Sequence, residues 1–373
     1  MPQVQPKKRD ATWDIARGIG MMLVIYGHFL EPMYPAKNGS PMIESAAAQW
    51  QVIYSFHMML FFLVSGAVNT SLPKKAWPEA LRASLRLLAL AWVVHIIGVI
   101  FAMIIGAAPD ATRSVWDALY AIGDPIVEGY LWSIGVLWFL TSLCFVQLLA
   151  YFTLGRIPAP AVVLVAMVAT AITPYLPNQY LLQTWFPGLS FFALGFLFTQ
   201  WQIRWPVWAA IPFLAAAILL APLNHGCSFS FSEHCGSEPF GVRMFAGSYG
   251  YLPLFFLSSL VGSLAVVCLS AGLARFAAPS AFLAYVGRNS LQLFIINGFV
   301  ATFLFGVLWQ VKWPHLTVFH YIGFAIGIIA AHLLVLRVLG PVLGWIDSAA
   351  LAISDFIVRL ITGATSRIQA KAA

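Results

Sequence analysis

The sequence predicts an all-α, polytopic membrane protein of about ten transmembrane helices. Of its 373 residues, 61% are hydrophobic and only 9% are charged, whereas a soluble domain carries about 25% charged residues. Apolar runs of roughly 20 residues, the length that crosses a bilayer as a helix, recur along the whole chain. A large soluble domain is therefore excluded. The net charge of +7 does not require nucleic acid as a partner, because membrane proteins collect Lys and Arg on their cytoplasmic side.

Hydropathy and charge together place the spans and orient them. With the N-terminus in the cytoplasm, only four of the 20 lysines and arginines fall outside, namely Lys37, Arg113, Arg243 and Lys312. This asymmetry predicts that both termini are cytoplasmic. The predicted spans lie near residues 15–36, 50–70, 83–107, 128–153, 159–176, 181–200, 206–222, 250–274, 284–308 and 317–340.

The first span carries ionisable residues along one helix face. Arg17 and His28 are eleven residues apart, which brings them to nearly the same face and separates them by roughly 16 Å along the axis. Asp14 and Glu31 extend this stripe at its two ends. Glu31 can orient the His28 imidazole from position i+3, or it is an interfacial acid that does not touch it. Ionisable groups inside a membrane are costly, so the stripe predicts a functional site.

The second span, 50–70, carries His57 at about the depth of His28, roughly 10–12 Å below the outer edge. The two histidines are therefore expected to share a cavity. Histidine suits a general base or a proton carrier near neutral pH. A structural hydrogen bond to a neighbouring helix is the alternative, and it is the expectation for His95, His320 and His332.

Two arginines, Arg82 and Arg86, lie at i,i+4 on one face at the inner end of the third span. A positive-inside signal explains them without a ligand, and a phosphate-binding patch is the other interpretation. Arg288 occupies the inner end of the ninth span. Two turns further in, Asn297 needs a polar partner.

The remaining segments carry less chemistry. Residues 108–127 are expected to form an amphipathic or re-entrant piece, and residues 341–373 a cytoplasmic interfacial helix and tail after a membrane domain spanning 1–340. Cys144 and Cys268 are expected in the core. In the outside loop, Cys227 and Cys235 are expected to form a disulfide, with two free thiols as the alternative. No metal site is expected.

Several short patterns follow one another in a fixed order. They comprise two runs in the first and second spans, the arginine pair, and three later motifs, at Asp14, Arg17, Gly18, Ile19, Val24, Gly27, His28, Phe56, Met58, Phe61, Phe62, Ser65, Gly66, Arg82, Arg86, Leu137–Leu140, Phe191–Gly195 and Gly287–Leu291. In this combination the chain resembles the acyltransferase-3 family of integral membrane enzymes, which O-acylate sugars and related acceptors. It departs from the family at Met59, where proline is usual, and at Asn297, where many relatives have a histidine.

The resemblance implies an acyl-CoA donor, most simply acetyl-CoA, that enters from the cytoplasm. Its phosphates would meet Arg82 and Arg86, with Arg17 and Arg288 as further contacts. His28, with Glu31 and His57 nearby, would deprotonate the acceptor hydroxyl or carry the acyl group. The implied acceptor is a cell-envelope glycan, a lipid-linked sugar or an exopolysaccharide precursor at the bacterial inner membrane. A basic group near His28 would favour succinyl transfer, and the sequence places none nearby.

Two other classes of protein fit the same residues. A proton-coupled small-molecule or glycan transporter also needs intramembrane His, Arg and acidic groups. A sensor or assembly partner of a secretion complex is the third possibility. Dependence on acyl-CoA separates the enzyme from the transporter, since a carrier moves its substrate without consuming it.

Overall fold

A computed structural model describes residues 10–33, 43–105, 115–131, 133–203, 205–224, 241–308, 311, 313 and 316–372. These residues form helices, turns and irregular segments, with no β-strand among them. The helices are α1 Ala11–Leu30, α2 Glu44–Val68, α3 Trp77–Ile104, α4 Val115–Gly123, α5 Pro125–Glu128, α6 Trp138–Thr153, α7 Ala159–Ile172, α8 Leu182–Gln200, α9 Ala210–Leu220, α10 Leu252–Leu273, α11 Ala277–Arg288, α12 Ser290–Phe299, α13 Phe305–Leu308 and α14 Val318–Ala372. A π-helix, η8 Val300–Leu304, joins α12 to α13.

The predicted fold class is confirmed. Within the described ranges, five helices are long and apolar enough to cross a bilayer: Glu44–Val68, Trp77–Ile104, Gln179–Gln200, Leu252–Leu273 and Val318–Gly363. Shorter apolar helices and α1 account for the other predicted spans. The fourth span begins later than predicted, at Trp138, because the preceding residues form turns. The ninth is interrupted at Asn289, where α11 ends and α12 begins.

Two pairs of glycines bring helices into backbone contact. A Cβ atom on Gly18 of α1 would meet the Leu283 carbonyl oxygen of α11, and one on Gly287 of α11 would meet the Asp14 carbonyl oxygen of α1. Gly66 of α2 and Gly195 of α8 are related in the same reciprocal way, each lying against the other helix's backbone. Small residues allow transmembrane helices to approach this closely. Four glycines of the sequence motifs therefore fix helix crossings.

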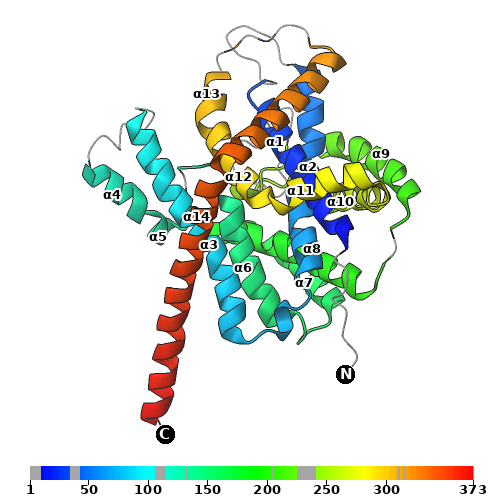
Figure 1. The fold of residues 1–373 in the computed structure, drawn as a ribbon. Helices are drawn as coiled ribbons and strands as arrows, with labels where there is room; N and C mark the ends of the chain where they lie inside the picture. Colours follow the sequence, from blue (N-terminus) through cyan, green and yellow to red (C-terminus); the bar gives the residue numbers. More distant parts are fainter. Residues whose placement is uncertain are drawn as a thin grey trace.

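The C-terminal helix is longer than the sequence indicated. No helix end coincides with residue 340, because α14 continues through Pro341 to Ala372. It packs along α3 and then projects beyond the bundle (Figure 1). The placement of residues 341–373 on the cytoplasmic leaflet stays a prediction, as does the domain boundary.

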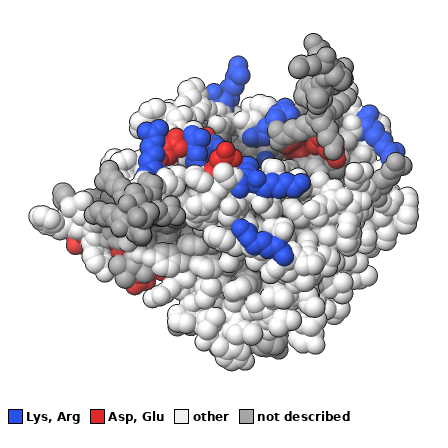
Figure 2. Space-filling model, turned by 90° about the horizontal axis from the view of Figure 1, so that it is seen from below, with Lys and Arg blue, Asp and Glu red and all other residues white. Residues whose placement is uncertain are grey.

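Basic side chains gather on one face of the molecule. Figure 2 shows Lys and Arg, with several acidic residues between them, on the face seen from below. The C-terminal end of α14 points to the same side (Figure 1). The charge of this surface agrees with the predicted cytoplasmic orientation. Cys144 and Cys268 are buried and free, as expected. Cys227 and Cys235 lie outside the described residues, so their disulfide stays a prediction.

Candidate active site

A cavity of about 690 Å³ opens where α1 begins and α2 ends, and we call it the inner cavity. α1 contributes Arg17 and Met21 to its wall, and α3 contributes Arg86. Its other lining residues include Asp10, Trp13, Phe61, Ser65, Asn69, Phe139, Gln147, Ser290, Leu291 and Phe294. The cavity is therefore a mixed site, with apolar walls that suit an organic ligand and cationic groups that suit an anionic one.

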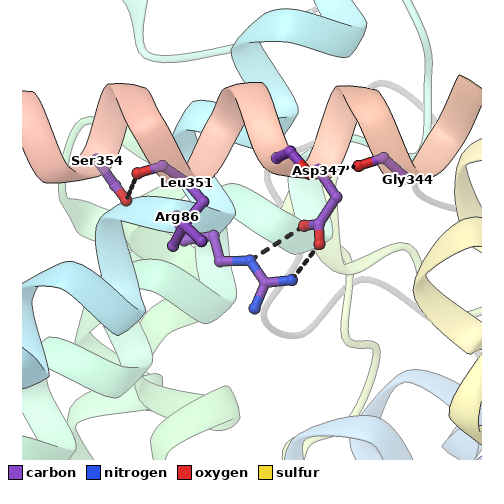
Figure 3. A network of polar contacts seen from close by, with 6 residues as sticks. Arg86, Gly344, Asp347, Leu351 and Ser354 are labelled. Carbon is purple, nitrogen blue, oxygen red and sulfur yellow. Dashed lines mark hydrogen bonds and ion pairs between the residues drawn. The ribbon is translucent and has the colours of Figure 1, made fainter.

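Both arginines of the predicted phosphate-binding pair contact carboxylates on α14. Arg86 donates from Nε to Asp347 Oδ1 at 3.0 Å and from Nη2 to Oδ2 at 2.5 Å (Figure 3). Arg82 forms a similar two-bond pair with Asp355. Only Arg86 lines the inner cavity; Arg82 does not, and Arg288 is exposed at the end of α11. The geometry thus brings Arg17 and Arg86 to one cavity and leaves Arg82 and Arg288 at the surface around it.

A second cavity of about 300 Å³, the outer cavity, lies at the opposite end of α1. His28 and His57 both line it, as expected from their similar depth, and Glu31 lines it as well. Its wall is completed by Tyr54, Met58, Tyr130, Gly135, Val136, Trp138, Val242, Arg243, Met244, Phe245, Phe294, Ala301 and Thr302. The stripe on α1 therefore has a basic end in one cavity and an imidazole end in the other.

Hydrogen bonds fix the side chains of the outer cavity. The amide nitrogen of Asn297, Nδ2, lies 2.6 Å from His28 Nδ1. His57 Nδ1 lies 2.8 Å from the Ile53 carbonyl oxygen, which can only accept, so His57 carries its proton on Nδ1. Tyr54 donates to Glu31 Oε2 at 3.2 Å, and its ring lies edge-on to His28 and tilted against His57. Glu31 is thus held by Tyr54 in a shared cavity with both histidines.

Three groups at this site escaped sequence analysis. Tyr54 gave no signal. Asn297 was noted as a polar group that needs a partner and as a departure from the family pattern, but its partner, His28, was not foreseen. Arg243 was counted as an ordinary outside charge, yet it lines the outer cavity and stacks over the Trp50 ring at 5.7 Å. The expectation that no basic group lies near His28 is therefore wrong, because the fold returns a distant loop to this cavity.

The other buried histidines have structural contacts. His95 Nδ1 lies 2.6 Å from Ser133 Oγ, and its Nε2 lies 3.1 Å from the Ala121 carbonyl oxygen. His332 Nδ1 lies 2.8 Å from the Ile328 carbonyl oxygen of its own helix. Over the described ranges, no group of His, Cys, Asp and Glu side chains has an arrangement that could hold a metal ion.

A family model described as an acyltransferase domain matches residues 10–337. Nodulation protein NolL of Mesorhizobium japonicum is 26% identical over 355 residues, which cover 86% of this chain and 85% of that protein. No solved structure matches the chain. With the family model matched across most of its length, the chain belongs to the acyltransferase-3 family of membrane acyltransferases.

Proposed function

We propose that the protein transfers an acyl group, most simply acetyl, from cytoplasmic acyl-CoA to a hydroxyl of a cell-envelope glycan or exopolysaccharide precursor. The observation that carries this proposal is the division of α1 between two cavities. Arg17 lines the inner cavity and His28 lines the outer one. An anionic donor and a hydroxyl acceptor can therefore approach the same helix from its two ends.

The inner cavity is the proposed donor site. Acyl-CoA carries phosphates, and the fork of an arginine side chain suits phosphate oxygens. Arg17 and Arg86 line the cavity, whereas Arg82 and Arg288 are exposed and do not line it, so we place the phosphate contacts on Arg17 and Arg86. The apolar walls, which include Phe61 and Leu140, suit the pantetheine arm and the acyl group.

The outer cavity is the proposed site of chemistry. The acceptor hydroxyl gives its proton to His28 Nε2 while its oxygen attacks the thioester carbonyl carbon. The carbon–sulfur bond then breaks, an ester forms, and CoA leaves as a thiolate that takes the proton back from His28. This sequence needs the His28 proton on Nδ1, whereas the structure places the amide nitrogen of Asn297 there. We therefore propose that the amide turns over for catalysis, so that its oxygen accepts the Nδ1 proton. A transient acyl group on His28 would use the same nitrogen.

Two further side chains complete the proposed acceptor site. His57 keeps Nε2 available because its Nδ1 is occupied by the Ile53 carbonyl. Arg243 supplies a positive charge that can hold an anionic group, either on the acceptor glycan or on a dicarboxylic acyl chain. Its place in the cavity removes the sequence-based reason for preferring acetyl over succinyl, so donors of both kinds belong in the assay.

The test is release of free CoA by the purified protein in lipid nanodiscs. Acetyl-CoA and succinyl-CoA are supplied with and without candidate glycans, and wild type is compared with His28→Ala and Arg86→Ala. We expect release that depends on His28 and a raised donor KM in Arg86→Ala. Unchanged release in His28→Ala refutes the role of His28. Glycan movement across the membrane without consumption of acyl-CoA would favour the transporter, which no present observation supports.

A further inference from the structure

One aromatic side chain separates the two cavities. Phe294 on α12 lines both of them, and among the described residues it is the one that does so. The side chain is buried, with 6% of its surface exposed. Whatever passes between the inner and outer cavities by this route must pass its ring.

The face of α12 that carries Phe294 leads from one cavity to the other. Ser290 and Leu291 line the inner cavity, and Ala301 and Thr302, which follow α12, line the outer one. Between them, Asn297 contacts His28. Residues three apart share a helix face. Phe294 therefore lies one turn, about 4.5 Å, to the inner side of the residue that holds His28.

Neighbouring helices change cavity at the same level. On α2, Phe61 lines the inner cavity and Met58, one turn away, lines the outer cavity. On α6, Phe139 lines the inner cavity and the adjacent Trp138 lines the outer cavity. The Phe139 ring packs edge-on against Phe61 at 5.8 Å and against Phe294 at 5.6 Å, measured between ring centroids. The partition at this level is thus a layer of aromatic rings rather than a thick wall.

We propose that Phe294 is the gate between the donor and acceptor cavities, and that its ring limits the size of the acyl group transferred. This proposal rests on the proposed function, since a thioester held at Arg17 and Arg86 must reach His28 on the far side of the ring. Rotation of a phenylalanine about its side-chain bonds opens a narrow apolar passage. A short uncharged acyl group fits such a passage, whereas a long chain overfills it and a carboxylate loses its hydration there.

Truncation of Phe294 tests the gate directly. Full-length protein in nanodiscs is given acetyl-, butyryl- and hexanoyl-CoA with p-nitrophenyl glycosides as acceptor probes, and kcat/KM is measured from CoA release. We expect wild type to prefer acetyl-CoA. Phe294→Ala should raise the ratio of kcat/KM for butyryl-CoA to kcat/KM for acetyl-CoA roughly tenfold or more. This is the discrimination that an apolar pocket typically achieves for one or two methylene groups. Phe294→Trp should slow transfer from every donor while donor binding is kept.

The control is Phe256→Ala. Phe256 is buried to a similar degree, with 9% exposed, and packs against Phe191 and Phe255 away from both cavities. Its truncation should leave the donor ratio unchanged. The gate is refuted if Phe294→Ala, or the milder Phe294→Leu where the alanine variant does not fold, keeps the wild-type ratio in an active enzyme. Absence of CoA release that depends on His28 in wild type refutes the proposed function, and the gate with it.

Discussion

Replacement of Asp347 by asparagine is expected to tighten donor binding. Arg86 donates two hydrogen bonds to the Asp347 carboxylate while it lines the inner cavity. If Arg86 binds a phosphate of acyl-CoA, that phosphate and the carboxylate compete for the same guanidinium. The asparagine keeps the size of the side chain and removes the competing charge. Donor affinity should rise as a result.

The size of the effect follows from the exposure of the pair. The Arg86 and Asp347 side chains are 41% and 32% exposed, so solvent screens their attraction and the pair contributes about 1 kcal/mol. Because a tenfold change in an equilibrium constant corresponds to about 1.4 kcal/mol, the Kd of acetyl-CoA should fall about fivefold in Asp347→Asn. In an Arg86→Ala background the same substitution should have no further effect, since the contested group is gone.

Calorimetric titration of acetyl-CoA measures its Kd for four nanodisc-embedded proteins: wild type, Asp347→Asn, Arg86→Ala and the double variant. Asp355→Asn is the matched control, because it frees Arg82, which does not line the inner cavity. If the Kd of acetyl-CoA is the same or higher in Asp347→Asn, and is unchanged in Arg86→Ala, then the Arg86–Asp347 and Arg82–Asp355 pairs only attach α14 to α3. Melting curves of each variant report that attachment separately.

Three further outcomes are expected. Asn297→Ala removes the hydrogen bond to His28, so kcat should fall roughly 5- to 150-fold, equivalent to about 1–3 kcal/mol, at constant donor KM; an unchanged kcat means that Asn297 only fills space. Arg243→Gln should raise the KM of anionic acceptors and leave titrations of acetyl-CoA unaltered. Gly195→Ala forces a methyl group against the α2 backbone, so overpacking should cost about 1–3 kcal/mol and lower the melting temperature. Gly327→Ala is the control, because a Cβ atom there meets nothing within 4 Å and the melting temperature should stay the same.

The first helix could be predicted well because its geometry is local. The period and rise of an α-helix alone place Arg17 and His28 at opposite ends of one stripe, and the two cavities lie at those ends. His57 followed from the same measure of depth on the next helix. Positions along a single helix can be calculated without knowledge of what packs against it.

Partners from distant parts of the chain could not be predicted in this way. Asp347 is 261 residues from Arg86, and no periodicity relates the two. The continuation of α14 through Pro341 was equally hidden, since proline usually ends or kinks a helix. Arg243 belongs to a loop whose return to the outer cavity depends on the whole fold. Tertiary packing decides these contacts, and local sequence carries little information about them.

The motif residues themselves divide into two physical roles. Arg17 and His28 face cavities, whereas Gly18 contacts α11 beside Leu283 and Gly287. α11 is followed, after one residue, by α12, which carries Phe294 and Asn297. The crossing of α1 and α11 therefore sets the height of Asn297 relative to His28.

That coupling explains why a glycine belongs in a pattern that otherwise consists of reactive groups. A slide of half a helical turn, about 2.7 Å, would exceed the tolerance of the 2.6 Å contact between Asn297 and His28. It would also displace Phe294 from the level at which Phe61 and Phe139 close the partition. Any residue larger than glycine at 18 or 287 must move one helix relative to the other, because the added Cβ meets backbone atoms that cannot rotate aside.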